Sequence, residues 1–169
     1  MIKKTFYTIL ILLTVSIVYL NFLGISTNKF NQNIENKFGE NYSGINIKLN
    51  KVKLLLDVST LSVNLETENA IISSEKEKIK LEKISTKYDA KSFFTKKFAV
   101  KNLSIDSKKN QIKKFIKLAR SYKDSPQLLI LDKLVKTGDV KTSIKLNFDE
   151  SGRLVEDKYE VLADISNLS

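Results

Sequence analysis

Hydrophobic positions along this chain begin with one uninterrupted apolar stretch. No charged residue occurs from Thr5 to Asn28, and the run from Phe6 to Leu23 is almost wholly apolar. A helix needs roughly 20 such residues to cross the hydrocarbon core of a bilayer. We therefore expect residues 1–28 to form an N-terminal tail and transmembrane anchor, and residues 29–169 to form a separate extracytoplasmic, β-rich domain.

A cleaved signal peptide is the competing interpretation of the same stretch. Lys3 and Lys4 would form its basic start, and Gly24-Ile25-Ser26 offers small residues for a cleavage site. The apolar run is longer than the about 7–15 residues typical of a signal peptide, which favours an uncleaved anchor. Under either interpretation the rest of the chain crosses the membrane, and the lysines at the start favour a cytoplasmic N-terminus.

After the anchor, the spacing indicates a short helix. Phe30, Ile34 and Phe38 recur every fourth residue, and Gly39 stands where a C-cap glycine is common. This predicts a helix over residues 28–38, with an apolar stripe on one side. The stripe lies on the bilayer surface or, in the interpretation we favour, packs on the strands that follow.

Alternation of apolar and polar residues then predicts a series of strands. A change of phase after Leu49 indicates a bulge or turn near Asn50-Lys51. The last two strands form an antiparallel hairpin, because Asp149 to Gly152 has the composition of a turn. The predicted strands are residues 45–49, 52–56, 61–65, 79–88, 98–105, 140–148 and 159–165.

Two helical patterns interrupt the strands. Apolar residues at three- and four-residue spacing from Ile112 to Tyr122, with lysines between them, predict a basic amphipathic helix. It either touches anionic headgroups or, as is more common, covers a sheet. Ser125-Pro126 opens a second helix that Gly138 ends. The predicted fold class is therefore α+β: a mostly antiparallel, curved, groove-like sheet with an N-terminal transmembrane helix and two short covering helices.

The amino-acid composition limits the kinds of functional site that the chain can form. The chain has no histidine and no cysteine, which excludes disulfides, thiolate metal sites and histidine-based catalysis, and its five glycines form no phosphate-binding loop. We expect no enzyme, no cofactor and no metal. The 29 basic residues outnumber the 19 acidic ones and favour anionic partners such as phospholipid headgroups. Passage across a membrane argues against nucleic acid as the partner.

The order of elements resembles a known family. The succession is the apolar anchor, a helix ending in 33–39, a strand pair over 45–56, a strand at 61–65, a strand at 98–105, and a hairpin over 144–154. It is similar to the N-terminal region of AsmA-like envelope proteins of the YhdP and TamB type. Members are anchored in the bacterial inner membrane and fold as long curved sheets with an apolar groove.

The resemblance implies a function that the residue patterns do not. It implies the N-terminal part of a bridge-like factor for phospholipid transport and outer-membrane assembly, with the domain in the periplasm. Its implied partners are the phospholipid membrane, phospholipid as cargo and other envelope proteins. Full-length members are much longer, so this chain would be the anchoring start of such a bridge, and another chain or further residues would complete its sheet.

The apolar sides of the predicted strands are the candidate lipid site. They either pack into an ordinary core or remain partly open as a groove. A different class of function also stays open, in which a small anchored scaffold holds a protein partner by its exposed sheet edge. The groove candidates are Ile45, Ile47, Leu49, Leu61, Val63, Leu65, Ile144, Leu146 and Phe148.

Overall fold

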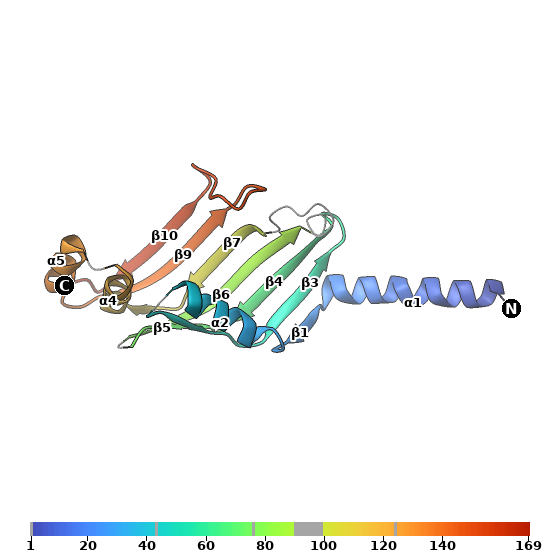
Figure 1. The fold of residues 1–169 in the computed structure, drawn as a ribbon, viewed down its shortest axis with the longest axis horizontal. Helices are drawn as coiled ribbons and strands as arrows, with labels where there is room; N and C mark the ends of the chain where they lie inside the picture. The colour runs from blue at the N-terminus through green and yellow to red at the C-terminus, as the bar shows by residue number, and fades with distance from the viewer. Residues whose placement is uncertain (1, 43, 76, 90–99, 124) are drawn as a thin grey trace.

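The computed structural model describes residues 2–42, 44–75, 77–89, 100–123 and 125–169. It confirms the predicted fold class: an apolar N-terminal helix leads into an open antiparallel sheet that carries shorter helices (Figure 1). The long helix and the sheet lie one after the other along the long axis of the molecule (Figure 1).

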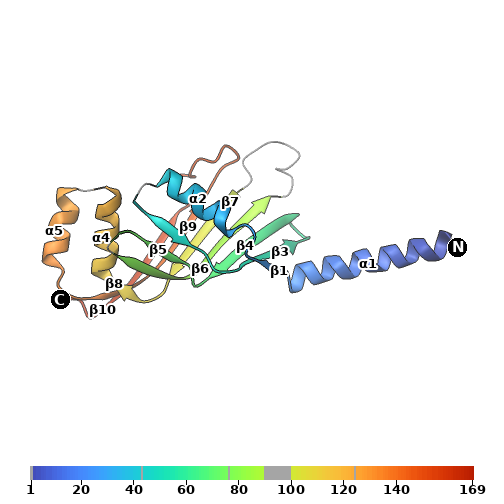
Figure 2. The ribbon, with the colours of Figure 1, turned by 60° about the horizontal axis from the view of Figure 1, so that its bottom comes forward.

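Helix α1 (Ile2–Phe22) carries the apolar run. Hydroxyls within it, such as those of Thr14 and Ser16, donate to backbone carbonyls one turn earlier, at 2.9 and 2.8 Å, so these polar groups need no water. Among the described residues it is the one helix long and apolar enough to cross a membrane, over Lys3–Phe22, and none of that span is buried in the protein. It extends away from the sheet (Figure 2).

The sheet has ten strands, all paired antiparallel. Its main path runs β1 (Ile25–Thr27), β3 (Val52–Asp57), β4 (Ser62–Glu68), β6 (Lys78–Asp89), β7 (Val100–Ser107), β9 (Asp139–Asn147) and β10 (Glu160–Ser166). Three short strands lie off this path: β2 (Asn46–Lys48), β5 (Ile71–Ser73) and β8 (Asn110–Gln111). Strand β2 pairs with β5, and β8 pairs with β9.

The pairing of β2 corrects one expectation. Strands β2 and β3, which we expected to form one pair, do not pair with each other: β2 pairs with β5, and β3 pairs with β1 and β4. Asn69 explains the split, because its φ of 57° kinks the chain between β4 and β5. The kink separates the partner of β3 from the partner of β2, and β6 pairs with both β4 and β5.

The junction between α1 and the sheet is tight. Helix α1 ends where the Gly24 N–H donates to the Tyr19 carbonyl at 3.1 Å, and Gly24 has a φ of 69°. Gly24 is buried, and an added Cβ would collide with the Leu54 carbonyl. Ile25 then enters the sheet opposite Leu54, so β1, a part of the predicted anchor segment, is the first strand of the domain.

Helix α2 (Asn31–Asn41) is held to the segment after β2. The Leu49 N–H donates to Glu35 Oε1 at 2.7 Å, and the Asn31 amide donates to the Asn50 carbonyl. Gly39 lies inside the helix, which ends with the Tyr42 N–H donating to the Phe38 carbonyl at 3.0 Å. The predicted end at Phe38 with a C-cap glycine is therefore wrong.

The closed core lies under helix α4 (Ile112–Tyr122), beside the start of β6. Ala70, Ile79 and Leu81 form its buried centre. Ile116 of α4 is buried, whereas helix α5 (Pro126–Leu134) has no buried residue and so covers the sheet less than we predicted. The partly buried residues around the centre are Leu49, Ile72, Ile84, Ile105, Phe115 and Leu118.

Candidate functional site

The register of the strands gives the sheet one apolar face. Directly opposed residues in a ladder point to the same side, so each row across the sheet lies on one face. One row is Val52, Thr67, Ile84, Ile105, Ile144 and Val161. The next row is Ile25, Leu54, Leu65, Thr86, Leu103 and Leu146. We call the side that carries these rows the apolar face.

Charged side chains gather on the opposite side, which is the polar face. Cross-strand ion pairs join Lys83 to Glu66 at 3.1 Å and Lys145 to Glu160 at 2.8 Å. The Glu160 carboxylate raises the pKa of Lys145 through its hydrogen bond and its charge. These pairs are partly exposed and each adds at most about 1 kcal/mol to stability. Their main effect is to keep this face hydrated, so helices and other apolar groups can pack only on the apolar face.

Helix α2 lies over part of the sheet (Figure 2). Residues of the helix and of the apolar face line a groove between them. The groove has a volume of about 720 Å³, within the range of about 300–1,000 Å³ typical of small-molecule sites. Phe30, which is 53% exposed, and Ile34 border it from α2 and the turn before it. The sheet side consists of Val52, Leu54, Val63, Leu65 and Tyr88, and polar groups of Asn33, Asn36, Lys37 and Glu40 complete the lining.

No match was found when this chain was compared with protein-family models, curated proteins and solved structures. Its function is therefore inferred from the geometry of the sheet together with the sequence patterns.

Four of the nine candidate groove residues share the apolar face. Val63 and Leu65 line the groove beneath α2. Ile144 and Leu146 lie on β9, in the two rows described above, and both are half-buried. The structure thus brings the β4 and β9 candidates to one side of one sheet, although β6 and β7 separate them.

The other five candidates lie elsewhere. Ile47 pairs with Ile72 in the small β2–β5 ladder, and Leu49 packs against the closed core. Ile45, half-buried, precedes β2. Leu61 lies in the turn before β4 with a φ of 47° and 52% exposure. Phe148 follows β9 and forms an isolated bridge with Leu154.

Sequence reasoning missed five residues that line the groove: Phe30, Ile34, Val52, Leu54 and Tyr88. The signal was present, because the helical stripe that begins at Phe30 and the even-numbered alternation of β3 are both visible in the sequence. The packing of α2 on the strands that follow was also expected, and the structure confirms it, but the sequence did not show which residues would line a groove between helix and sheet. That packing rests on the polar contacts of Asn31 and Glu35, which no apolar pattern indicates.

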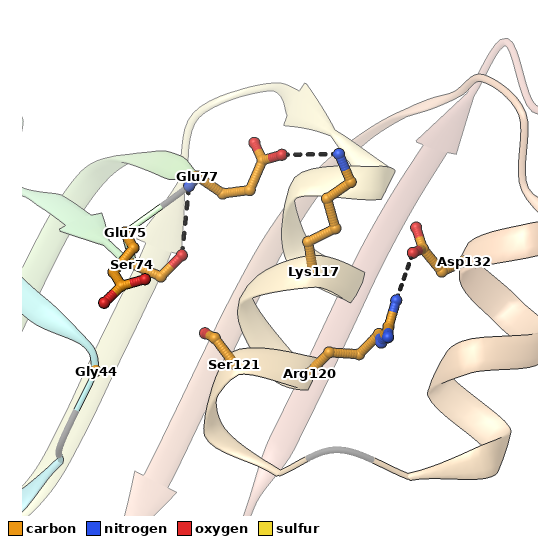
Figure 3. A pocket seen from close by; sticks show the side chains of 8 residues that line it. All are labelled: Gly44, Ser74, Glu75, Glu77, Lys117, Arg120, Ser121 and Asp132. Atoms are coloured by element: carbon orange, nitrogen blue, oxygen red, sulfur yellow. Dashed lines mark hydrogen bonds and ion pairs between the residues drawn. The ribbon is translucent and has the colours of Figure 1, made fainter.

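A second, polar cavity of about 550 Å³ lies between the β5–β6 turn and helices α4 and α5 (Figure 3). Lys117 pairs with Glu77 at 3.0 Å, and Arg120 pairs with Asp132 at 2.7 Å. The Glu77 N–H also donates to Ser74 Oγ at 3.3 Å. These bonds hold α4 to the turn and to α5. The charged side chains around the cavity therefore serve to join these elements, and the ion pairs neutralise the charges of Lys117 and Arg120.

Proposed function

We propose that this protein binds phospholipid acyl chains on its apolar face, as the membrane-anchored start of a bridge-like lipid transporter of the AsmA-like type. The observation that carries the proposal is the continuity of the apolar face. It runs from β1, directly after α1, to the open strand β10 at the other edge of the sheet. Transport of this kind needs an apolar surface and no catalytic group.

The groove beneath α2 is the proposed first binding position. Burial of an acyl chain contributes about 0.8 kcal/mol per methylene, so ten buried methylenes would contribute about 8 kcal/mol before the costs of binding. The half-exposed Phe30 at its border gives such a chain apolar contacts on the helix side. The polar side chains that complete the lining suit the glycerol and headgroup region.

The path from the bilayer to this groove is short. Ile25 of β1 lies opposite Leu54, which lines the groove, and paired strands are only about 5 Å apart. If α1 crosses the inner membrane, the groove opens next to the headgroups. Lys3 and Lys4 support a cytoplasmic N-terminus, which would leave the sheet in the periplasm.

The decisive experiment measures phospholipid that remains with the full chain after purification from membranes in mild detergent. We expect Phe30→Asp to lower the bound phospholipid severalfold, because the charge would stand at the border of the groove. Leu61→Asp is the matched control, since Leu61 has nearly the same exposure but lies outside the groove lining. Equal lipid in the two variants and in the wild type would contradict the proposal.

The free edge of β10 favours a second candidate function, a scaffold that holds a partner by strand addition. Within the described residues β10 pairs with β9 alone, and it is exposed along most of its length. A partner strand would hydrogen-bond its outer backbone groups. Hydrogen exchange of the β10 amides should then be slower in native membranes than in the purified protein, and equal rates would remove this candidate.

A further inference from the structure

Helix α5 carries an apolar stripe that the described part of the chain leaves largely exposed. Ile130, Leu131 and Leu134 are 57%, 43% and 70% exposed. We call these three residues the α5 stripe. The helix itself is well defined, because Ser125 Oγ accepts from the Leu128 N–H at 3.3 Å and Pro126 occupies its first turn. A cluster of large exposed apolar side chains on a regular helix usually marks a surface for binding.

The stripe does not serve the contact between α5 and the rest of the domain. The Arg120–Asp132 ion pair at 2.7 Å links α5 to α4 (Figure 3). On a helix, Ile130 and Leu134 lie one turn apart on one side, while Asp132 points to another side. The stripe is therefore free to bind something outside the described chain.

The surroundings of the stripe are basic. Over residues 112–136 the cations are Lys113, Lys114, Lys117, Arg120, Lys123, Lys133 and Lys136, against two acids, Asp124 and Asp132. Asp132 is already paired with Arg120, and Lys117 is paired with Glu77, so the basic excess rests on Lys113, Lys114, Lys123, Lys133 and Lys136. Apolar side chains flanked by lysines are the combination with which interfacial helices bind anionic lipid surfaces. A protein partner would require a matching acidic rim, whereas an anionic bilayer offers one everywhere.

The position of α5 decides which bilayer it can reach. The α4–α5 pair lies at the opposite end of the molecule from α1 in both views (Figures 1 and 2). A bilayer that α1 crosses is therefore remote from the stripe. We propose that the α5 stripe inserts into the surface of a second, anionic bilayer, so that the anchored chain tethers two membranes. This inference uses the anchor of the proposed function but none of its groove residues.

A vesicle-capture experiment tests the tether. The full chain is reconstituted in donor vesicles, and capture of labelled acceptor vesicles of phosphatidylcholine and phosphatidylglycerol is measured by co-flotation. Ile130→Asp combined with Leu134→Asp should reduce capture by at least about tenfold. Transfer of one large apolar side chain from water into the bilayer strengthens binding by roughly that factor, and the double variant loses two such side chains. Acceptors of phosphatidylcholine alone, or high salt, should also reduce capture.

Leu162→Asp is the matched control, because Leu162 is an apolar residue of β10 with 54% exposure and lies outside the stripe. It should capture acceptors like the wild type. Flotation of the protein with its donor vesicles tests the anchor separately, and a thermal unfolding scan confirms that each variant is folded. Capture by the double variant equal to wild type, or capture that is independent of lipid charge, would overturn the proposal.

Discussion

Gly24 is the residue at which the helix and the sheet meet. Its φ of 69° costs an L-amino acid side chain about 1–2 kcal/mol, and the Leu54 carbonyl leaves no room for a Cβ. We expect Gly24→Ala to lower the free energy of unfolding of the domain by about 2 kcal/mol or more. Denaturant unfolding in detergent would measure the loss, and faster hydrogen exchange in β1 and β3 would locate it.

Gly39 offers the control within the same chain. It lies inside α2, where a Cβ would have as its nearest neighbour the Asn46 side chain at 3.4 Å. Alanine is the better helix former by about 0.5–1 kcal/mol, so Gly39→Ala should leave the domain at least as stable as the wild type. Equal losses for both variants would mean that the α1–β1 junction has no special geometry.

Protonation of Asp57 determines how acid affects the stability of the turn between β3 and β4. Hydrogen bonds from Ser59 and Thr60, with a further one from Lys87 at 3.1 Å, hold the pKa of the Asp57 carboxyl well below its usual range. A lowered folded-state pKa means that the unfolded chain binds the proton more readily. The stabilisation is therefore complete above about pH 4, the ordinary pKa, and declines as the pH falls further.

Asp57→Asn should lower the melting temperature at pH 7, because the amide cannot pair with the Lys87 ammonium. At about pH 3 and below, the wild type loses part of the same stabilisation, so the gap between the two proteins should narrow. Thermal unfolding followed at both pH values measures this difference. A gap that stays constant or widens in acid would show that the carboxylate charge contributes nothing.

At the scale of elements, the docking of α2 forms the groove. The Glu35 carboxylate accepts the Leu49 N–H at 2.7 Å, and removal of an acceptor from a partly buried N–H costs about 1–3 kcal/mol. We expect Glu35→Ala to loosen α2, which should speed hydrogen exchange of the Leu49 amide and reduce lipid binding together. Gln32→Ala, an exposed position of the same helix, should change neither.

Strand alternation was predictable because it records burial directly. The pattern Val63, Leu65 and the pattern Ile144, Leu146 each specify a strand and the side that faces inward. Strand partners were predictable where a turn joins neighbours, as in the confirmed β9–β10 hairpin, but the partner of β2 was not. The pairing of β2 with β5 depends on the backbone kink at Asn69, and a single residue with positive φ leaves no trace in hydrophobic periodicity.

The candidate site, too, was predictable only in part. Val63 and Leu65 alternate within one predicted strand, and both line the groove beneath α2. Leu49 alternates in the same way within its own predicted strand, 45–49, yet it packs against the closed core. The difference arises from the kinked strand pairs, which fold the β2–β5 region toward α4 and leave β3 and β4 to α2.

At the scale of the whole molecule, the open sheet has two unlike edges. The β1 edge follows α1 directly, whereas the β10 edge has Val161 and Ile165 exposed on the apolar face. An apolar face that reaches an unpaired edge is costly in water unless something covers it. Lipid on the face and a further strand at the edge each reduce that cost, and both fit the AsmA-like proposal.

The state of the N-terminus decides whether α1 stays attached to this sheet. We expect protein extracted from bacterial membranes to retain the whole of α1 by intact mass, and protease added outside the inner membrane to digest the domain but spare α1. A mature N-terminus just after Ser26 would instead establish a cleaved signal peptide. Such a cut would remove Ile25 and Ser26 from the ladder with β3 and uncover the β3 edge beside Leu54. Because the buried Gly24 also packs on Leu54, the sheet is built to include this junction, and that favours the uncleaved anchor.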